Sequence, residues 1–101
     1  MKPLAVEIHP EAVLEARAAR EWYESKSPEA AVAFVAELDA GIDSIRVASE
    51  IYPPYLHGTR RYLMHRFPYL IVYRTTPAAL QVVAVAHGRR RPGYWKTRFA
   101  R

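Results

Sequence analysis

The N-terminal part of the chain combines a short β-rich stretch with a helical repeat of apolar residues. Residues 4–9 (LAVEIH) alternate weakly and end at Pro10, which predicts a first strand. Proline followed by Glu11 is typical of a first helical turn, where the acid meets the positive helix end. The apolar residues beyond it recur at helical spacing: Val13, Leu14, Ala16, Ala18 and Trp22. The pattern predicts a helix over residues 11–26 that buries this stripe.

A second helical repeat follows another start signal. Ser27 stands at the capping position and Pro28 at the first helical position. The apolar residues that mark one face of this segment are Phe34, Leu38, Ile42 and Ile45. We therefore expect a second helix over residues 29–48 that forms a hairpin with the first.

The second half of the chain changes to a period of two. Its prolines exclude a helix at residues 51–58. Three stretches rich in Tyr, Ile, Val and Phe follow at residues 59–67, 69–75 and 80–87, separated by proline-containing turns. The sequence predicts one α+β domain of order β-α-α-β-β-β, an antiparallel sheet with the helical hairpin packed on one face.

Composition limits the class of protein. With 101 residues and no cysteine, the chain fits one small domain without disulfides, thiolate metal sites or cysteine nucleophiles. No apolar run approaches the roughly 18 residues of a membrane helix, and the N-terminus lacks the apolar core of a signal peptide. The four histidines lack ligand spacing, and glycine-rich phosphate loops are missing. We expect a soluble cytoplasmic protein with no metal and no cofactor.

The charges are segregated along the chain. All ten acidic residues lie between Glu7 and Glu50, whereas the second half carries ten Lys and Arg residues and no acid. Segregation of this kind indicates a polyanion or an acidic partner for the second half. The alternative is a basic surface that serves solubility, but solubility does not require the signs to be separated.

The C-terminal segment VVAVAHGRRRPGYWKTRFAR joins cations to aromatics directly after the last predicted strand. Guanidinium groups and stacking rings suit RNA, DNA or an acidic protein segment equally well. The alternative for Tyr94 and Trp95 is structural, with Pro92 and Gly93 turning the chain so that both rings cover the sheet. The candidates for binding a target or a nucleic acid are Arg60, Arg66, Arg90, Arg91, Trp95, Lys96 and Arg98.

Three stretches, in order, resemble one family. They are HPEAVLEARAAREWYESKSPEAAVAFVAELDAGIDSI, GTRRYLMHRFPYLIVYR and VVAVAHGRRRPGYW. Together they resemble the RelE/ParE superfamily, the toxins of bacterial type II toxin-antitoxin pairs, which includes plasmid-stabilisation proteins. The resemblance implies a toxin domain over residues 1–101 and a hetero-oligomer with a cognate antitoxin protein.

The resemblance leaves the target open, because members that cut messenger RNA on the ribosome and members that inhibit DNA gyrase share one fold. Metal-independent RNA cleavage needs a base, a stabiliser of the phosphorane and a proton donor. The candidates are Arg61, His65, Arg89 and Tyr94. Arg61 and His65 lie an even number of residues apart, so we expect them on one face of the second strand of the three.

The distribution of lysine favours one activity over the other. The lysines that ribosome-dependent nucleases favour near this strand are missing, since the chain has none between Lys26 and Lys96. We therefore favour a ParE-like toxin that inhibits gyrase by binding it. The alternatives are a RelE-like ribosome-dependent mRNA endoribonuclease and a non-toxic nucleic-acid-binding module.

Overall fold

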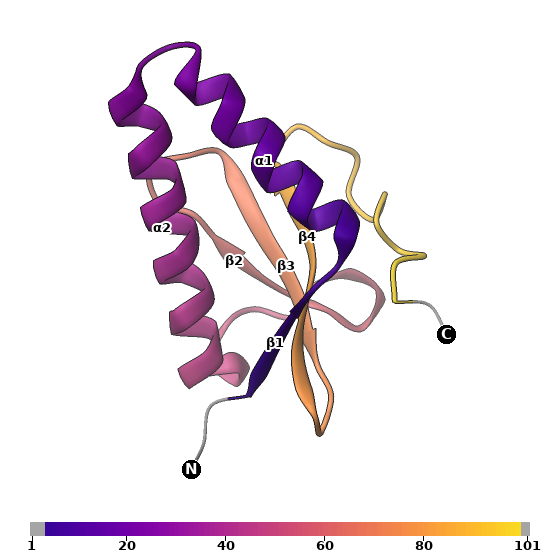
Figure 1. Ribbon diagram of the computed structural model, residues 1–101. Helices are drawn as coiled ribbons and strands as arrows, with labels where there is room; N and C mark the ends of the chain where they lie inside the picture. The colour runs from indigo at the N-terminus through magenta and orange to yellow at the C-terminus, as the bar shows by residue number, and fades with distance from the viewer. Residues whose placement is uncertain (1–3, 100–101) are drawn as a thin grey trace.

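The computed structural model describes residues 4–99, which form two helices packed on one face of a four-stranded sheet (Figure 1). The elements are β1 (Ala5–Ile8), α1 (Pro10–Glu24), α2 (Pro28–Val47), β2 (Arg60–Leu63), β3 (Tyr69–Thr75) and β4 (Ala79–His87). Short 3-10 turns occupy Ser49–Ile51 and Leu56–Gly58. The predicted α+β class and β-α-α-β-β-β order are confirmed. Within the described residues, neither helix is long and apolar enough to cross a membrane.

The sheet has the strand order β1-β4-β3-β2, so the last three strands form the predicted antiparallel meander. The sheet is not fully antiparallel, because β1 pairs in parallel with β4, with Ala5 opposite Ala79. The helical hairpin carries the chain from β1 to the far edge of the sheet, and the meander then returns to lie beside β1 (Figure 1).

β2 is shorter than the predicted strand over residues 59–67 and ends at Leu63. The backbone N–H groups of His65 and Arg66 donate to the carboxylate of Glu37 on α2 instead of continuing the ladder with β3. The register pairs Leu63 with Leu70, so the residues between them form the hairpin turn, and a side chain far away in the sequence holds that turn.

The core beneath the helices confirms the stripe of α2 and corrects that of α1. Phe34 and Leu38 are buried as expected. On α1, however, Leu14 and Trp22 are 51% and 57% exposed, and the buried residues are Ala12 and Ala19. Small alanines let α1 pack closely on β4, so the helix is rotated toward its alanine side and the larger residues of the predicted stripe face outward.

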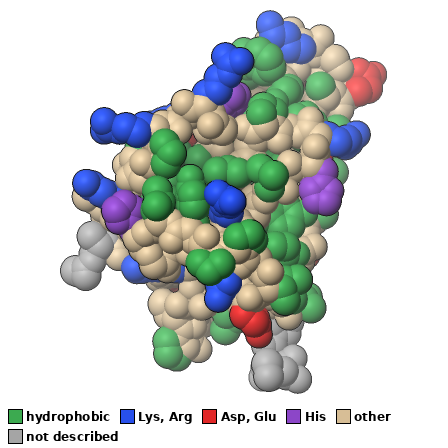
Figure 2. Space-filling model, turned by 180° about the vertical axis from the view of Figure 1, so that it is seen from behind, with side chains coloured by type: hydrophobic (Ala, Val, Ile, Leu, Met, Phe, Trp, Pro, Cys, Tyr) green, Lys and Arg blue, Asp and Glu red, His purple; other side chains and the backbone are tan. Residues whose placement is uncertain are grey.

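The opposite face of the sheet is also covered. A second cluster of buried side chains consists of Val72, Val83, Ala84, Ala86 and Trp95. Trp95 belongs to the segment after β4, which turns at Gly93 (φ +85°) and lies against this face. Figure 2 shows the molecule from this side, with Lys and Arg side chains scattered among apolar ones and acidic side chains sparse.

Candidate functional site

The site begins where β4 leaves its neighbouring strands. Its register against β3 shifts at Val83, the extra residue of a β-bulge. Val82 and Val85 both enter the core beneath the helices although they lie three residues apart. Without the bulge, strand alternation would turn Val85 and His87 to the other face. The bulge therefore directs the end of β4 toward α1.

Glu15 of α1 receives this end of the strand and the C-terminal segment together. β1 pairs with β4 only as far as Val82, and beyond that point the N–H of Val85 donates to Glu15 Oε1 at 3.0 Å. The Tyr94 hydroxyl donates to Oε2 at 2.6 Å, and both terminal nitrogens of Arg98 donate to the carboxylate at 3.0 Å. Arg90 adds an ion pair at 3.7 Å. We call the side chains of Glu15, Arg90, Tyr94 and Arg98 the tail clamp.

Aromatic packing reinforces the tail clamp. The guanidinium of Arg90 lies 3.7 Å from the centre of the Tyr94 ring, which is a close cation–π contact. Trp95 is only 2% exposed and its ring lies 5.9 Å from that of Tyr55. The ring of Trp95 is therefore part of a core. This is the structural alternative that the sequence leaves open for Tyr94 and Trp95.

The clamp holds the hydroxyl proton of Tyr94. Burial and the hydrogen bond to Glu15 both raise the pKa of its hydroxyl well above the ordinary value of 10.0, and the nearby arginines oppose this only in part. A phenol is protonated at neutral pH even at its ordinary pKa, and in the clamp its proton is directed to Glu15. In this arrangement the hydroxyl cannot act as a base toward a bound substrate.

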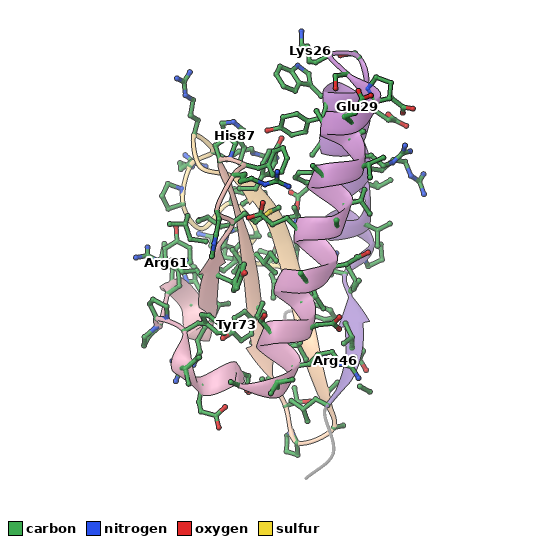
Figure 3. All side chains as sticks on the ribbon, turned by 90° about the vertical axis from the view of Figure 1, so that its left-hand side faces the viewer. Lys26, Glu29, Arg46, Arg61, Tyr73 and His87 are labelled. Atoms are coloured by element: carbon green, nitrogen blue, oxygen red, sulfur yellow. The ribbon has the colours of Figure 1, made fainter. Side chains whose placement is uncertain are left out.

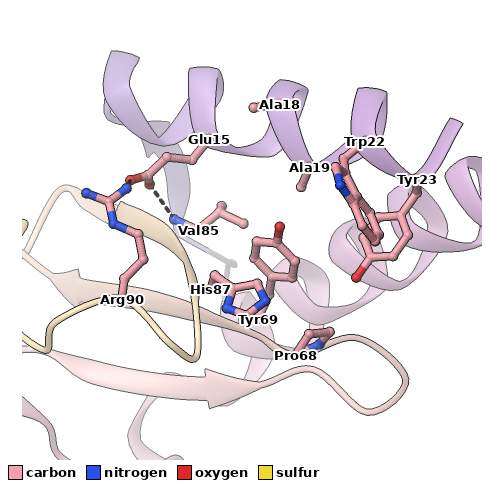
Figure 4. Close-up of a pocket in the computed structure, with 10 residues that line it drawn as sticks. All are labelled: Glu15, Ala18, Ala19, Trp22, Tyr23, Pro68, Tyr69, Val85, His87 and Arg90. Atoms are coloured by element: carbon pink, nitrogen blue, oxygen red, sulfur yellow. Dashed lines mark hydrogen bonds and ion pairs between the residues drawn. The ribbon is translucent and has the colours of Figure 1, made fainter. Parts of the chain in front are cut away.

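A groove of about 510 Å³ lies between α1 and the ends of β3 and β4 (Figure 4). Its walls are largely apolar and aromatic: Ala18, Ala19, Trp22, Tyr23, Tyr69 and Val85. Pro68 and His87 lie at its floor, and Glu15 and Arg90 lie at one end. We call this the α1 groove. It shares two side chains with the tail clamp.

The candidates around β2 lie in separate places. Arg60 donates to the backbone oxygen of Tyr52 at 2.6 Å, which ties it to its own loop. Arg61 is exposed on the side of the sheet away from the helices (Figure 3) and lies over the Tyr55 ring. His65 follows the end of β2 and stacks on the Tyr62 ring, which packs against the helix-side core. The expected common face of Arg61 and His65 is therefore not observed, because the strand ends before His65.

Arg66 lies beside α2, in the turn that follows β2. Its Nε lies 3.5 Å from Glu37, and its side chain is 66% exposed. The arginine thus helps to anchor the turn after β2 while its guanidinium remains open to solvent.

The cations that the structure describes in the C-terminal segment, between residues 89 and 98, fall into two groups. Arg90 and Arg98 belong to the tail clamp, where the Arg98 side chain is only 13% exposed. The other three are exposed: Arg89, Arg91 and Lys96. The N–H of Arg89 donates to Nδ1 of His87 at 3.0 Å, which fixes the start of the segment. The described part of the segment therefore presents three cations from a docked backbone.

Sequence reasoning missed Glu15, although a signal for it exists. Glu15 lies on the same helical stripe as Ala12 and Ala19, so it points toward the sheet once that stripe is recognised as the buried one. A carboxylate there needs cationic partners. In this chain the second half can supply such partners for Glu15, because its cations have no neighbouring acids.

The described residues hold no cluster of three or more histidine, aspartate or glutamate side chains suited to a metal ion. The arrangement instead offers a cationic, aromatic surface and an apolar groove. Aromatic residues and arginine are enriched at protein interfaces, and apolar grooves bind peptides or small ligands.

Comparison with known proteins identifies the family. None of the curated protein sequences is significantly similar to the chain. A solved structure from the chromosomal ParDE TA system of P. aeruginosa has the same fold, with a TM-score of 0.74 and 16% identity, over 83% of this chain and 95% of that chain. The family model of the ParE toxin of the type II toxin-antitoxin system parDE matches residues 6–92. This chain therefore belongs to the ParE toxin family of type II toxin-antitoxin systems.

Proposed function

We propose that the protein is the growth-inhibiting toxin of a type II toxin-antitoxin pair and acts by binding DNA gyrase, not by cutting messenger RNA. Its partner is a cognate antitoxin protein. Membership of the ParE toxin family supports the toxin role, and the features of the C-terminal segment support the choice of target.

The engagement of Tyr94 is the observation on which this choice rests. Its hydroxyl donates to Glu15 at 2.6 Å, and burial together with this hydrogen bond raises its pKa, so its proton is held inside the tail clamp. A nuclease that used this tyrosine as a base or acid would have to break the tail clamp first. A toxin that acts by binding needs only the position of the segment, which the clamp supplies.

The remaining nuclease candidates engage different elements. Arg61 lies over Tyr55 on the sheet face that the C-terminal segment covers, whereas His65 stacks on Tyr62 beside the helices. Arg89 follows His87 at the end of β4. A phosphorane must be surrounded by its stabilising groups at hydrogen-bonding distance. Cations spread over a surface instead suit the recognition of a large partner.

The experiment is expression of the toxin alone, with messenger cleavage and the DNA damage response recorded in the same cells. We expect growth arrest with induction of the damage response, and inhibition of gyrase supercoiling by the purified protein. Tyr94→Phe should leave these effects nearly unchanged, because the ring still packs under Arg90 and only one hydrogen bond is lost.

The matched control is Arg91→Ala, which removes one exposed cation and no internal contact with Glu15. This variant should weaken gyrase inhibition without loss of stability. Codon-periodic messenger cuts that disappear with Tyr94→Phe would overturn the proposal in favour of a ribosome-dependent nuclease. Absence of any growth effect would instead favour a non-toxic nucleic-acid-binding module.

A further inference from the structure

We propose that a small cationic cavity beside the C-terminal segment is a binding site for a single phosphate group. The inference goes beyond the proposed function and does not depend on the choice of target, because the isolated chain is enough to test it.

The cavity lies on the sheet face that the C-terminal segment covers, and it has a volume of about 90 Å³. Val83 and Trp95 of the second buried cluster form part of its apolar lining. Its polar side chains come from the loop before β2, from β3 and from the C-terminal segment: His57, Thr59, Arg74, Lys96 and Arg98. We call it the cationic cavity.

The charges around the cationic cavity do not balance. Three of the residues that line it are Lys or Arg, and none of them is an acid. Arg98 pairs with Glu15 at 3.0 Å, so this pair adds little net charge. Within residues 4–99, neither Arg74 nor Lys96 forms an ion pair. The cavity therefore keeps an excess of positive charge, which favours an anion.

Arg74 is fixed in place by neutral acceptors. Its Nε donates to Gln81 Oε1 at 2.7 Å, and its Nη2 donates to the backbone oxygen of Phe99 at 2.7 Å. Glu7 accepts from the other end of the Gln81 amide at 2.9 Å, so its carboxylate meets Arg74 only through a neutral side chain. These contacts orient the guanidinium without neutralising it. An oriented arginine loses little side-chain entropy when it binds a phosphate.

Size and geometry favour a phosphate group over other anions. A water molecule occupies about 30 Å³ of the liquid, so the cationic cavity has room for about three waters. This space suits one small oxyanion and leaves a sugar or a base outside. A carboxylate is matched by the planar fork of one arginine. Cations that come from β3 and from two positions of the C-terminal segment instead match the oxygens of a tetrahedral phosphate.

Backbone strain is concentrated at the same place. Within the described residues, the non-glycine residues with positive φ are His57, at 60°, and Phe99, at 55°, and both line the cavity. This conformation is unfavourable for bulky side chains. Packing maintains it at His57, because the imidazole lies edge-on to Trp95 at 5.8 Å and its Nε2 would lie 3.1 Å from a Cβ on Gly93. Strain that packing maintains is typical of ligand sites.

The experiment titrates inorganic phosphate into the purified full chain and follows binding by phosphorus NMR, with sodium chloride at equal ionic strength as the reference. We expect saturable binding of phosphate that chloride does not prevent. Lys96→Glu places an acid at the cavity and should lower phosphate affinity by about tenfold or more. Lys96→Arg keeps the charge and should change the affinity by less than about threefold.

The matched control is Arg91→Glu. Arg91 is exposed in the same segment and does not line the cavity, so the same change of charge should alter phosphate affinity by less than about threefold. Circular dichroism checks that each variant keeps its fold. Equal losses of affinity in Lys96→Glu and Arg91→Glu would overturn the inference, because they would indicate general attraction to a basic surface. Absence of saturable phosphate binding to the wild type would overturn it as well.

A competition experiment distinguishes the sources of the phosphate group. If a short single-stranded DNA displaces inorganic phosphate, the cavity accepts a backbone phosphate of a nucleic acid. If the DNA leaves phosphate binding unchanged, the cavity accepts free or terminal phosphate. Both results support a phosphate site, and neither depends on whether the toxin inhibits gyrase.

Discussion

Glu15→Ala is the perturbation that tests most directly how the C-terminal segment is held. Glu15 is 13% exposed at its side chain and accepts hydrogen bonds from the Val85 N–H, the Tyr94 hydroxyl and Arg98. The substitution leaves two neutral donors without this acceptor and an almost buried guanidinium without its counter-charge. Breaking a buried ion pair from one side costs about 3–5 kcal/mol.

The expected loss has an upper bound, because the segment can lift off and rehydrate its polar groups. Lifting it exposes Trp95, and a buried tryptophan removes about 150–250 Å² from water, which corresponds to about 4–6 kcal/mol. We therefore expect Glu15→Ala to lower the free energy of unfolding by about 3–5 kcal/mol. Glu15→Gln keeps an acceptor for the Val85 N–H but no charge, so its loss should be smaller, at about 1.5–3 kcal/mol.

The assay is urea unfolding followed by fluorescence in a Trp22→Phe background, where Trp95 is the single tryptophan. Glu15→Ala should also shift the emission of Trp95 to longer wavelength before global unfolding, because the indole becomes solvated. In the Glu15→Ala background, Arg98→Met should be neutral or stabilising, since it removes the unpaired charge. A loss below about 1 kcal/mol with unchanged Trp95 emission would refute the reasoning, because it is the value of a surface pair.

Two further predictions concern the helix α2. A Cβ on Gly41 would lie 2.9 Å from Cε1 of Tyr62, so Gly41→Ala should cost about 1–3 kcal/mol in a urea titration despite its better helix propensity, and a more stable variant would contradict the close packing. Burial opposes ionisation of Glu37, but the N–H groups of His65 and Arg66 outweigh it and hold its pKa below the ordinary 4.5. Its stabilising effect is therefore complete above about pH 4.5 and is lost as the pH falls through the lower folded-state pKa. The melting temperature of the wild type should converge on that of Glu37→Gln on acidification, and a constant difference would exclude this linkage.

The order and approximate bounds of the elements could be predicted because the signals that start and end them are local. Pro10 and Pro28 start the helices where proline and the following acid indicate a first turn. β3 begins and ends as predicted, directly after Pro68 and before a turn that contains Pro77. These signals depend on backbone chemistry within a few residues, and the tertiary structure did not override them.

The rotation of α1 and the bulge in β4 could not be predicted, for different reasons. Two adjacent stripes of α1 are apolar, and hydrophobicity favours the one with Leu14 and Trp22, whereas close packing on the sheet selects the one with Ala12 and Ala19. In β4 the run VVAVA is apolar on both faces, so no alternation reveals the extra residue at Val83. Both features bear on the site, because the rotation of α1 hid Glu15 and the bulge in β4 hid the direction of His87.

The residues of the cationic C-terminal segment have two physical roles, which the sequence alone does not distinguish. Arg90 and Arg98 neutralise a single carboxylate, and Trp95 is buried against the sheet, so these residues fix the path of the backbone. Arg89 and Lys96 are exposed along that path. A surface cation on a flexible tail loses entropy when it binds, whereas one on a docked backbone has already lost most of it. Because Glu15 stands in both the tail clamp and the wall of the α1 groove, the helix that supports the groove also sets the position from which these cations meet a target.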